Sequence, residues 1–495
     1  MSKVFSRGIL VLATVTAVAA DKPAGLIHET WETVLLDGAR IGSLHTTFRE
    51  VGDGGQFRTE TDLDLSFRCY GAEVRMKREF ATEESSAGVV SAVSMKQLQD
   101  RGRQLTLQGT VEDGRLHVVV DGGRIERRIP WSDNVLGLAA QERLLVDRRP
   151  KPGDQFTFLR YEPTFNTVVT VRVTAKQPEP VGDAGAKLLR VELVPNRIEA
   201  AGTSIQPPGS VVWLDGGFRP ARREIELDGV GKVLLKRTTK EIATGAPDKP
   251  SDIGLRNLVA VNRRISDPHS TRSAVYRITL KGEPASAIVH DAHQDIRNVK
   301  GDTFELHVHP PRPERGASAG PAADEYLSRN YYVDSDNGNI REITRRATAG
   351  EQDAWSKALR IERWVSKAMR PSSGAELAPA SQIARDLTGD CRAYALLTAA
   401  MCRAAGIPSR TAIGLIYTER EASDPKFGFH MWTEVNIGGR WIGLDSTLGR
   451  GGVGACHIKI SDHSWYATRS LTPLLPVNRV LGKLSVEIVR IEAGN

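Results

Sequence analysis

The sequence predicts an α+β protein in which a β-rich N-terminal region is followed by a C-terminal region that mixes helices and strands. From residue 27 to about residue 243, short β-branched runs are separated by Asp-Gly and Gly-Gly pairs, which are signals for tight hairpins. From about residue 321 onwards, helical apolar spacing alternates with strand-like runs. A chain of 495 residues is too long for one hydrophobic core, so we expect several domains.

The first 20 residues have the pattern of a secretory signal peptide. Lys3 and Arg7 precede a short apolar run that ends in small residues. This run is shorter than the roughly 20 residues that a membrane-spanning helix needs, and no later stretch is long and apolar enough. We therefore expect export to the periplasm or the extracellular space, with no integral membrane span once residues 1–20 are removed.

Three domains are expected after the signal peptide. Residues 21–245 should form a β-rich N-terminal domain with one helical interruption near residues 135–143. A linker rich in Gly and Pro follows, and residues 246–320 should form a small strand-rich domain. Residues 321–495 should form the C-terminal domain, in which residues 354–369 show the spacing of an amphipathic helix.

Charge and cysteine content narrow the functional classes. The net charge of +7 is small for this length, and Lys and Arg are scattered, so nucleic-acid binding is not indicated. Four cysteines in an exported chain of this size do not make a disulfide scaffold. Cys391 and Cys402 would share one helix roughly 16 Å apart, too far to pair, and Cys402 fits a position in the core.

Cys391 stands where a loop turns into an apolar helix. Gly389 permits a close approach of the chain, Asp390 fits the N-cap, and Gly406 with Pro408 ends the helix. In the first turn, free N–H groups and the helix dipole favour an anion, which lowers a thiol pKa. The same N–H groups can hold an oxyanion. Taken alone, however, this pattern favours a buried structural cysteine over a nucleophile.

A predicted hairpin places a histidine beside an aspartate. If residues 438–439, both Gly, form a two-residue turn, Val435 pairs with Ile442 and the register is fixed. His430 and Asp445 then become diagonal neighbours on one face, with Cβ atoms roughly 7–8 Å apart. An imidazole–carboxylate hydrogen bond can span this separation. With Cys391, the two residues supply the parts of an activated sulfur nucleophile.

These residues resemble the transglutaminase-like superfamily. The motifs that carry the resemblance are Gly389-Asp390-Cys391, Arg403-Ala404-Ala405-Gly406-Ile407-Pro408-Ser409-Arg410, His430-Met431-Trp432-Thr433-Glu434-Val435, Trp441 and Asp445-Ser446-Thr447. The likeness is specific over residues 386–447 and does not extend before residue 321. It implies a papain-like C-terminal domain with a catalytic triad of Cys391, His430 and Asp445. Gln382 and Trp364 are candidates for the second oxyanion donor.

Other histidines give weaker signals. His290, His293, His307 and His309 lie close in sequence, but no Cys or Glu completes a metal-ligand pattern, and a solvated strand face is the preferred interpretation. We therefore expect neither a metal site nor a cofactor. His457 and His463 follow the triad, and surface loop positions are preferred for them over positions lining a cleft.

The sequence favours an exported thiol enzyme that acts on amide bonds of peptides or proteins, with hydrolysis preferred. The transglutaminase-like superfamily includes cross-linking acyltransferases, peptidases, amidases and inactive members, and an intact triad argues against the inactive class. Two alternatives stay open: a protein-glutamine amine transferase, and a non-catalytic envelope binding or scaffold protein. The acidic loop over residues 419–426 would suit an amine acceptor, although an ordinary solvated loop is preferred. The oligomeric state is not predicted.

Overall fold

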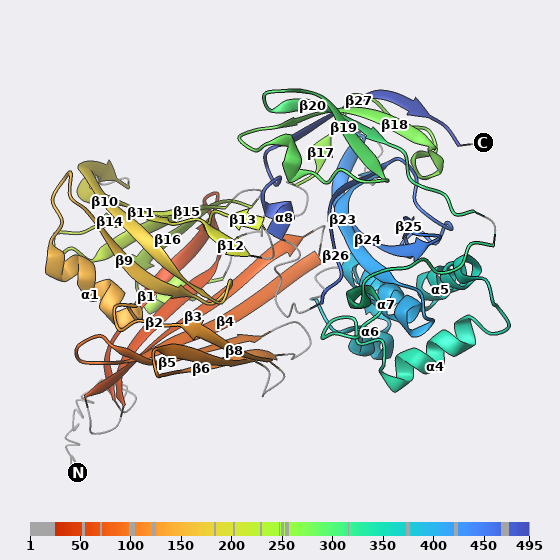
Figure 1. Ribbon diagram of the computed structural model, residues 1–495. Helices are drawn as coiled ribbons and strands as arrows, with labels where there is room; N and C mark the ends of the chain where they lie inside the picture. The colour runs from red at the N-terminus through yellow and green to blue at the C-terminus, as the bar shows by residue number, and fades with distance from the viewer. Residues whose placement is uncertain are drawn as a thin grey trace, which may run out of the picture.

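The computed structural model describes residues 25–494 except 52–54, 70–71, 99–103, 121–124, 183–184, 201–202, 228–229, 247, 249–251, 253–256, 315, 373–376, 420–423 and 467–474. The expected signal peptide therefore lies outside the described residues. Two bodies lie side by side. The N-terminal body consists almost entirely of β-strands, and the C-terminal body mixes helices and strands (Figure 1). This architecture confirms the predicted α+β class. No helix in the described part of the chain is long and apolar enough to cross a membrane.

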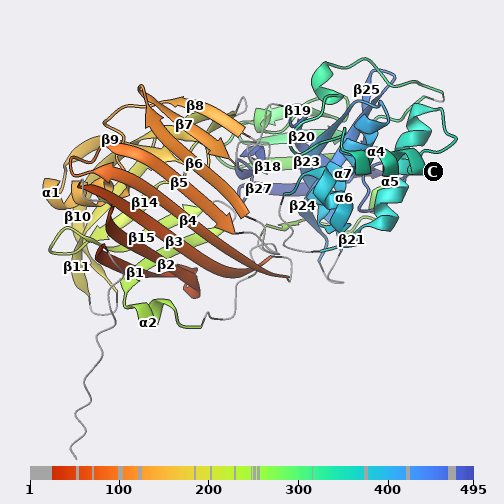
Figure 2. The same cartoon turned by 90° about the horizontal axis from the view of Figure 1, so that it is seen from below.

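The N-terminal body is one antiparallel sheet of 14 strands. The strand order starts with β8 to β1 in reverse chain order and continues with β16, β15, β14, β11, β10 and β9. Figure 2 shows β2 to β6 side by side. The strands are β1 (Leu26–Leu36), β2 (Ala39–Val51), β3 (Gln56–Cys69), β4 (Ala72–Ser85), β5 (Val90–Leu98), β6 (Gln104–Glu112), β7 (Arg115–Val120), β8 (Ile125–Pro130), β9 (Gln155–Glu162), β10 (Thr167–Val181), β11 (Ala186–Pro195), β14 (Ser210–Leu214), β15 (Pro220–Leu227) and β16 (Gly231–Thr238).

Short elements complete this body. They are the hairpin of β12 (Ile198–Ala200) and β13 (Thr203–Ile205), helix α1 (Leu138–Arg148) and helix α2 (Lys240–Ala243). Helix α1 corresponds to the helical interruption expected near residues 135–143. The buried carboxylate of Glu84 on β4 accepts the N–H groups of Ala139 and Ala140 at 2.9 and 3.0 Å. This contact fixes the first turn of α1 to the sheet.

The C-terminal body contains a five-stranded sheet that carries the candidate site. Its order is β17-β24-β23-β26, with β25 paired to β24. The strands are β17 (Val259–Ala260), β23 (Ser409–Thr418), β24 (Lys426–Ile437), β25 (Arg440–Leu444) and β26 (His457–His463). The helices are α4 (Gly338–Ala347), α5 (Ala354–Ala368), α6 (Ala380–Asp386), α7 (Cys391–Ala404) and α8 (Leu475–Asn478), with 3-10 turns η2 (Pro268–Ser270), η3 (Ala285–Ala287) and η4 (Asp324–Tyr326).

Two cores lie on this sheet. In one, buried apolar residues of α4 to α7, such as Ile361 and Leu397, pack with Met431 and Val435 of β24. A parallel pair of very short strands, β21 (Arg370–Pro371) and β22 (Thr388–Gly389), leads into α7. Figure 1 places the helices on one side of β23 and β24 and the second sheet on the other.

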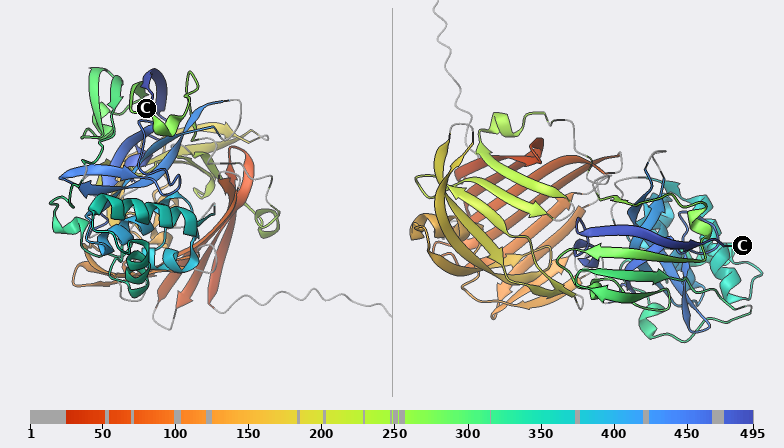
Figure 3. Two further views of the ribbon diagram at one scale, coloured as in Figure 1. Left: turned by 90° about the vertical axis from the view of Figure 1, so that its right-hand side faces the viewer. Right: turned by 90° about the horizontal axis from the view of Figure 1, so that it is seen from above.

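The second sheet joins two segments that were predicted to lie in separate domains. Its order is β19 (Gln294–Lys300), β20 (Thr303–Val308), β18 (Ser273–Leu280) and β27 (Leu484–Glu492), so the last strand of the chain pairs with β18. In the right-hand view of Figure 3, blue β27 lies beside the green strands. Tyr276 and Phe304 share a core with Tyr417 and Ile458 of the five-stranded sheet. Residues 246–320 therefore have no core of their own, and the expected boundary at residue 320 runs through one body.

Candidate functional site

The candidate nucleophile lies at the start of a buried helix. Cys391 is the first residue of α7 and is half-buried, and the Asp390 side chain accepts the Arg392 N–H at 3.0 Å as the N-cap. Gly389 is required by space, because a Cβ at this position would lie 2.3 Å from that of Ala393. The predicted cap and close approach are both confirmed. Cys391 therefore lies at the positive end of the helix dipole.

The hairpin adopts the register that its turn predicted. Residues 438–439 have φ values of 59° and 80°, which glycine adopts without strain, and Val435 pairs with Ile442. Regular pairing ends at Thr433 and Leu444. Asp445 therefore follows the last residue of β25, where its side chain turns toward His430.

The structure brings Cys391, His430 and Asp445 together. His430 Nε2 lies 2.8 Å from Asp445 Oδ2, and Cys391 lies near enough to the same imidazole to raise its pKa. Because Nε2 is engaged by Asp445, Nδ1 is the ring nitrogen left to interact with the thiol. The side chains of His430 and Asp445 are 9% and 1% exposed, so water competes little for their hydrogen bond.

The environment favours a positive imidazole and a negative carboxylate. Burial lowers the pKa of His430, but the charge and hydrogen bond of Asp445, with a contribution from Cys391, raise it to about 10. Burial raises the pKa of Asp445, but His430 and then His457 hold it well below its usual range. An imidazolium beside Cys391 stabilises the thiolate, which is the nucleophilic form of cysteine.

Asp445 has more partners than the triad requires. Its Oδ1 accepts the Thr447 N–H at 3.0 Å and the Thr447 hydroxyl, and its Oδ2 also lies 3.1 Å from His457 Nε2. Its backbone N–H donates to the buried carboxylate of Glu362 on α5 at 3.1 Å. The carboxylate is therefore held on both oxygens and at the backbone.

Two of these partners were missed or misplaced by sequence reasoning. His457 is fully buried on β26, which corrects the preferred surface-loop position, and His463 is half-buried at the end of the same strand. Glu362 falls on the apolar face of its helix, four residues after Ala358 and three before Val365, and this spacing was the signal that could have indicated a buried carboxylate. Its burial arises only because α5 packs against the segment that follows β25.

The weaker candidates lie on several elements. Trp364 packs against the helical core and Gln382 lies in α6. His307 lies 3.4 Å from Glu305 and His309 lies 3.5 Å from Asp295 at the surface. His293 is buried, and its Nε2 lies 2.8 Å from the His457 carbonyl oxygen. His293, His307 and His309 therefore make their direct contacts with three different residues.

One cluster in the described chain has the composition of a metal site. The ligand atoms of His430, Asp445 and His457 lie within 4.8 Å of one another, and all three residues are buried. Both Nε2–Oδ2 separations are those of direct hydrogen bonds. A metal would require both imidazoles to lose their Nε2 protons, so the arrangement fits a carboxylate shared by two N–H donors better.

Comparison with known proteins agrees with the geometry. Residues 341–446 match the family model described as the transglutaminase-like superfamily. This part of the chain is a transglutaminase-like domain. The match includes Cys391, His430 and Asp445 and confirms the resemblance seen in the sequence. No curated protein matches the chain in sequence.

Solved structures resemble parts of the chain at low identity. A candidate cysteine protease from Cytophaga hutchinsonii has 17% identity and a TM-score of 0.30, covering 46% of this chain and 84% of its own. A β-barrel-like protein of a domain of unknown function from Brucella abortus has 10% identity and a TM-score of 0.33, covering 44% and 98%. A candidate protease from Parabacteroides distasonis has 13% identity and a TM-score of 0.20, covering 70% and 64%.

Proposed function

We propose that this protein is an exported cysteine hydrolase that cleaves amide bonds of peptides or proteins through a thioester on Cys391. The observation that carries the proposal is the position of Cys391, in the first turn of α7, beside an imidazole that is hydrogen-bonded to Asp445. The transglutaminase-like domain supports a cysteine-protease-like activity. Export rests on the sequence pattern of residues 1–20 alone.

Each residue has one task in the proposed reaction. The Cys391 thiolate attacks the carbonyl carbon, and the oxyanion forms next to the first turn of α7, where the Cys391 N–H can stabilise it. His430 gives its proton to the amine nitrogen as the C–N bond breaks, which leaves a thioester. His430 then takes a proton from water as water attacks the thioester, and the Cys391 thiolate is released with the acid product. Asp445 holds the imidazole in the orientation that both transfers need.

The first test measures the reactivity of the thiol. At pH 6, iodoacetamide should alkylate Cys391 at least about tenfold faster than it alkylates Cys402, which is fully buried. Burial raises the pKa of the Cys402 thiol, so it serves as an internal control in the same molecule. Peptide mass mapping gives both rates. Equal slow labelling of the two cysteines would contradict the mechanism and favour a scaffold protein.

The second test separates hydrolysis from acyl transfer. Water and an amine compete for one thioester, and a transferase must hold the amine while water is excluded. The acidic loop over residues 419–426, which would suit an amine acceptor, includes residues 420–423, which lie outside the described residues. Casein incubated with the enzyme and millimolar dansylcadaverine should yield new amino termini rather than dansylated glutamine, as read by mass spectrometry. Predominant dansylation would reassign the protein as a transglutaminase.

A further inference from the structure

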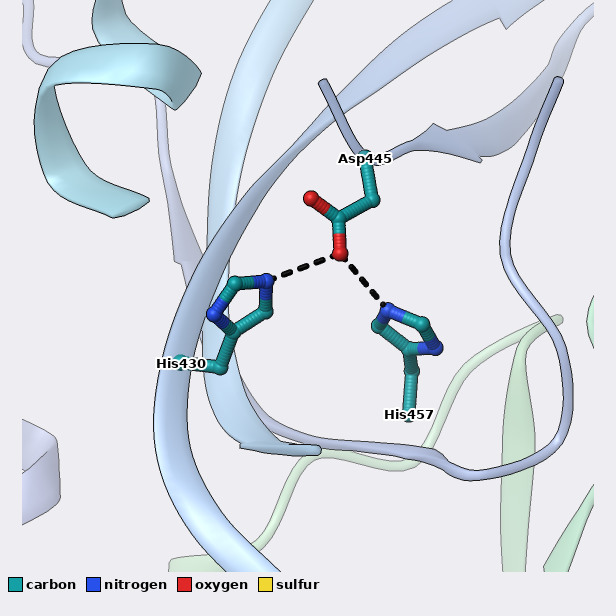
Figure 4. Close-up of side chains that lie close together, drawn as sticks. All are labelled: His430, Asp445 and His457. Atoms are coloured by element: carbon teal, nitrogen blue, oxygen red, sulfur yellow. Dashed lines mark hydrogen bonds and ion pairs between the residues drawn. The ribbon is translucent and has the colours of Figure 1, made fainter. Parts of the chain in front are cut away.

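A second imidazole contacts the carboxylate of the triad. His457 is the first residue of β26 and is fully buried, and its Nε2 lies 3.1 Å from the same Asp445 oxygen that faces His430. Figure 4 shows the rings of His430 and His457 converging on this oxygen from two sides. His457 has no task in the proposed reaction.

The surroundings of His457 determine its protonation. Asp445 can only accept, so Nε2 carries a proton, while the buried Nδ1 makes no hydrogen bond of good geometry with another described residue. Burial lowers the pKa of His457 and outweighs Asp445 and the Gly454 carbonyl, which raise it. The other titratable groups that face the ring are His430, which disfavours a second positive charge, and the ring of His269 at 6.2 Å. His457 is therefore a neutral imidazole that donates from Nε2.

Sharing one oxygen between two donors has a chemical consequence. A hydrogen bond to a carboxylate stabilises its negative charge and weakens its attraction for any other proton. Asp445 already favours the protonated form of His430 strongly. A general acid works best when its pKa lies near the working pH, so further strengthening of this pair would slow proton release.

We propose that His457 is a positioning residue that shares the Asp445 carboxylate with His430 and thereby eases transfer of the His430 proton to the leaving group. The inference rests on the proposed function of the triad. It predicts a dependence on the leaving group. Amide cleavage requires a proton on the departing nitrogen, whereas 4-nitrophenolate leaves an ester with the bonding electron pair and no proton.

The test compares two variants on two substrates. In His457→Met the ring is replaced by a side chain of similar length that has no donor, and in His457→Gln an amide N–H can replace Nε2–H. His457→Met should lower kcat for casein hydrolysis about tenfold with KM within about twofold, while acylation by 4-nitrophenyl acetate stays within about twofold. His457→Gln should stay within about threefold of the wild type on both. His307→Met, at a half-buried position of β20 in the second sheet, is the control and should change neither rate.

A second measurement needs no substrate. In His457→Met, the pH at which the His430 ring loses its proton, followed by ¹⁵N NMR of the imidazoles, should rise by about half a unit or more. An unchanged titration with unchanged casein turnover would overturn the inference. Equal loss of ester and amide turnover would also overturn it, because that pattern indicates general damage to the site. If wild-type Cys391 is not acylated by 4-nitrophenyl acetate, the proposed function fails first and the inference fails with it.

Discussion

The two bodies of this protein place their charged side chains differently. On the N-terminal sheet, ion pairs link neighbouring strands at the surface, as between Lys77 and Asp62 at 3.3 Å, with side chains 38% and 32% exposed. In the C-terminal body, Lys459 on β26 is fully buried and lies 2.8 Å from Glu434 on β24 and 2.6 Å from Asp291. The surface pairs lie on a sheet whose strands are already joined by backbone hydrogen bonds. The buried pairs connect separate elements inside the protein.

The buried network fixes the strands that carry the site. Burial lowers the pKa of Lys459, but Glu434 and the other nearby carboxylates raise it overall, so the ammonium stays charged. Arg410 on β23 also pairs with Glu434, at 2.8 Å. Glu434 lies on the strand of His430, and Lys459 lies two residues after His457. A buried charge is tolerated only when it is paired, and this network therefore resists sliding of β24 relative to β26.

Each body also contains a buried glutamate carboxylate, and the segment that this carboxylate holds differs between the two bodies. Glu84 and Glu362 each accept backbone N–H groups from a neighbouring segment. Glu84 anchors helix α1 to a sheet with no assigned chemistry, whereas Glu362 anchors Asp445 and Gly451. The same interaction serves folding in one body and the geometry of the candidate site in the other.

The largest expected effect is confined to one thiol. Cys391→Ala should lower casein hydrolysis by at least about 10³-fold while the protein stays folded, because sulfur is the only nucleophile proposed. Cys402→Ala on the same helix should spare turnover and lower the free energy of unfolding by about 1–2 kcal/mol through a small cavity. Circular dichroism and urea titration check folding in both variants. Equal loss of turnover in the two folded variants would contradict the assignment of Cys391.

Removing the buried lysine should have the next largest effect. Lys459→Met leaves Glu434 short of one partner in the interior and should lower the free energy of unfolding by about 3–5 kcal/mol. The matched variant on the N-terminal sheet, Lys77→Met, should change it by less than about 1 kcal/mol. Urea denaturation of both variants tests the comparison. Similar small changes would mean that the buried network does not hold the two strands together.

Glu362, which holds the Asp445 backbone, should make the free energy of unfolding depend on pH. Burial raises the pKa of Glu362 to about 7, although hydrogen bonds from three backbone N–H groups lower it. A carboxyl with a raised folded pKa stabilises the fold below its unfolded value of about 4.3, and this contribution is lost as pH rises to about 7. The stability of Glu362→Gln relative to the wild type should therefore improve by a few kcal/mol between pH 5 and pH 8. Thermal unfolding at four pH values measures the difference, and a constant offset would contradict the shifted titration.

The smallest effect should come from changing Glu84, which holds the start of α1 in the N-terminal body. Glu84→Gln replaces one accepting oxygen at the start of α1 by an NH₂ group and should lower the free energy of unfolding by about 1–2 kcal/mol. Alkylation of Cys391 should keep its wild-type rate, since α1 belongs to the other body. A matched loss of thiol reactivity would show that the two bodies are coupled.

The sequence by itself determined the parts of this protein whose signals are local. Asp-Gly and Gly-Gly turns indicated the N-terminal strands, and the two glycines at residues 438–439 set the register that brings His430 near Asp445. Capping residues marked the start of α7 at Cys391. Each of these signals acts within a few residues, where steric and hydrogen-bonding rules leave few conformations.

Only the tertiary structure decided which distant residues meet. The pairing of β27 with β18 joins segments about 200 residues apart and merges two expected domains, because the strands bury apolar faces that neither segment could cover alone. Glu362 and His457 reach Asp445 only once α5 and β26 have packed around it. Periodicity records which face of an element is buried, but not the neighbour against which it is buried. The contacts of Asp445 with Glu362 and His457 are therefore decided by the fold.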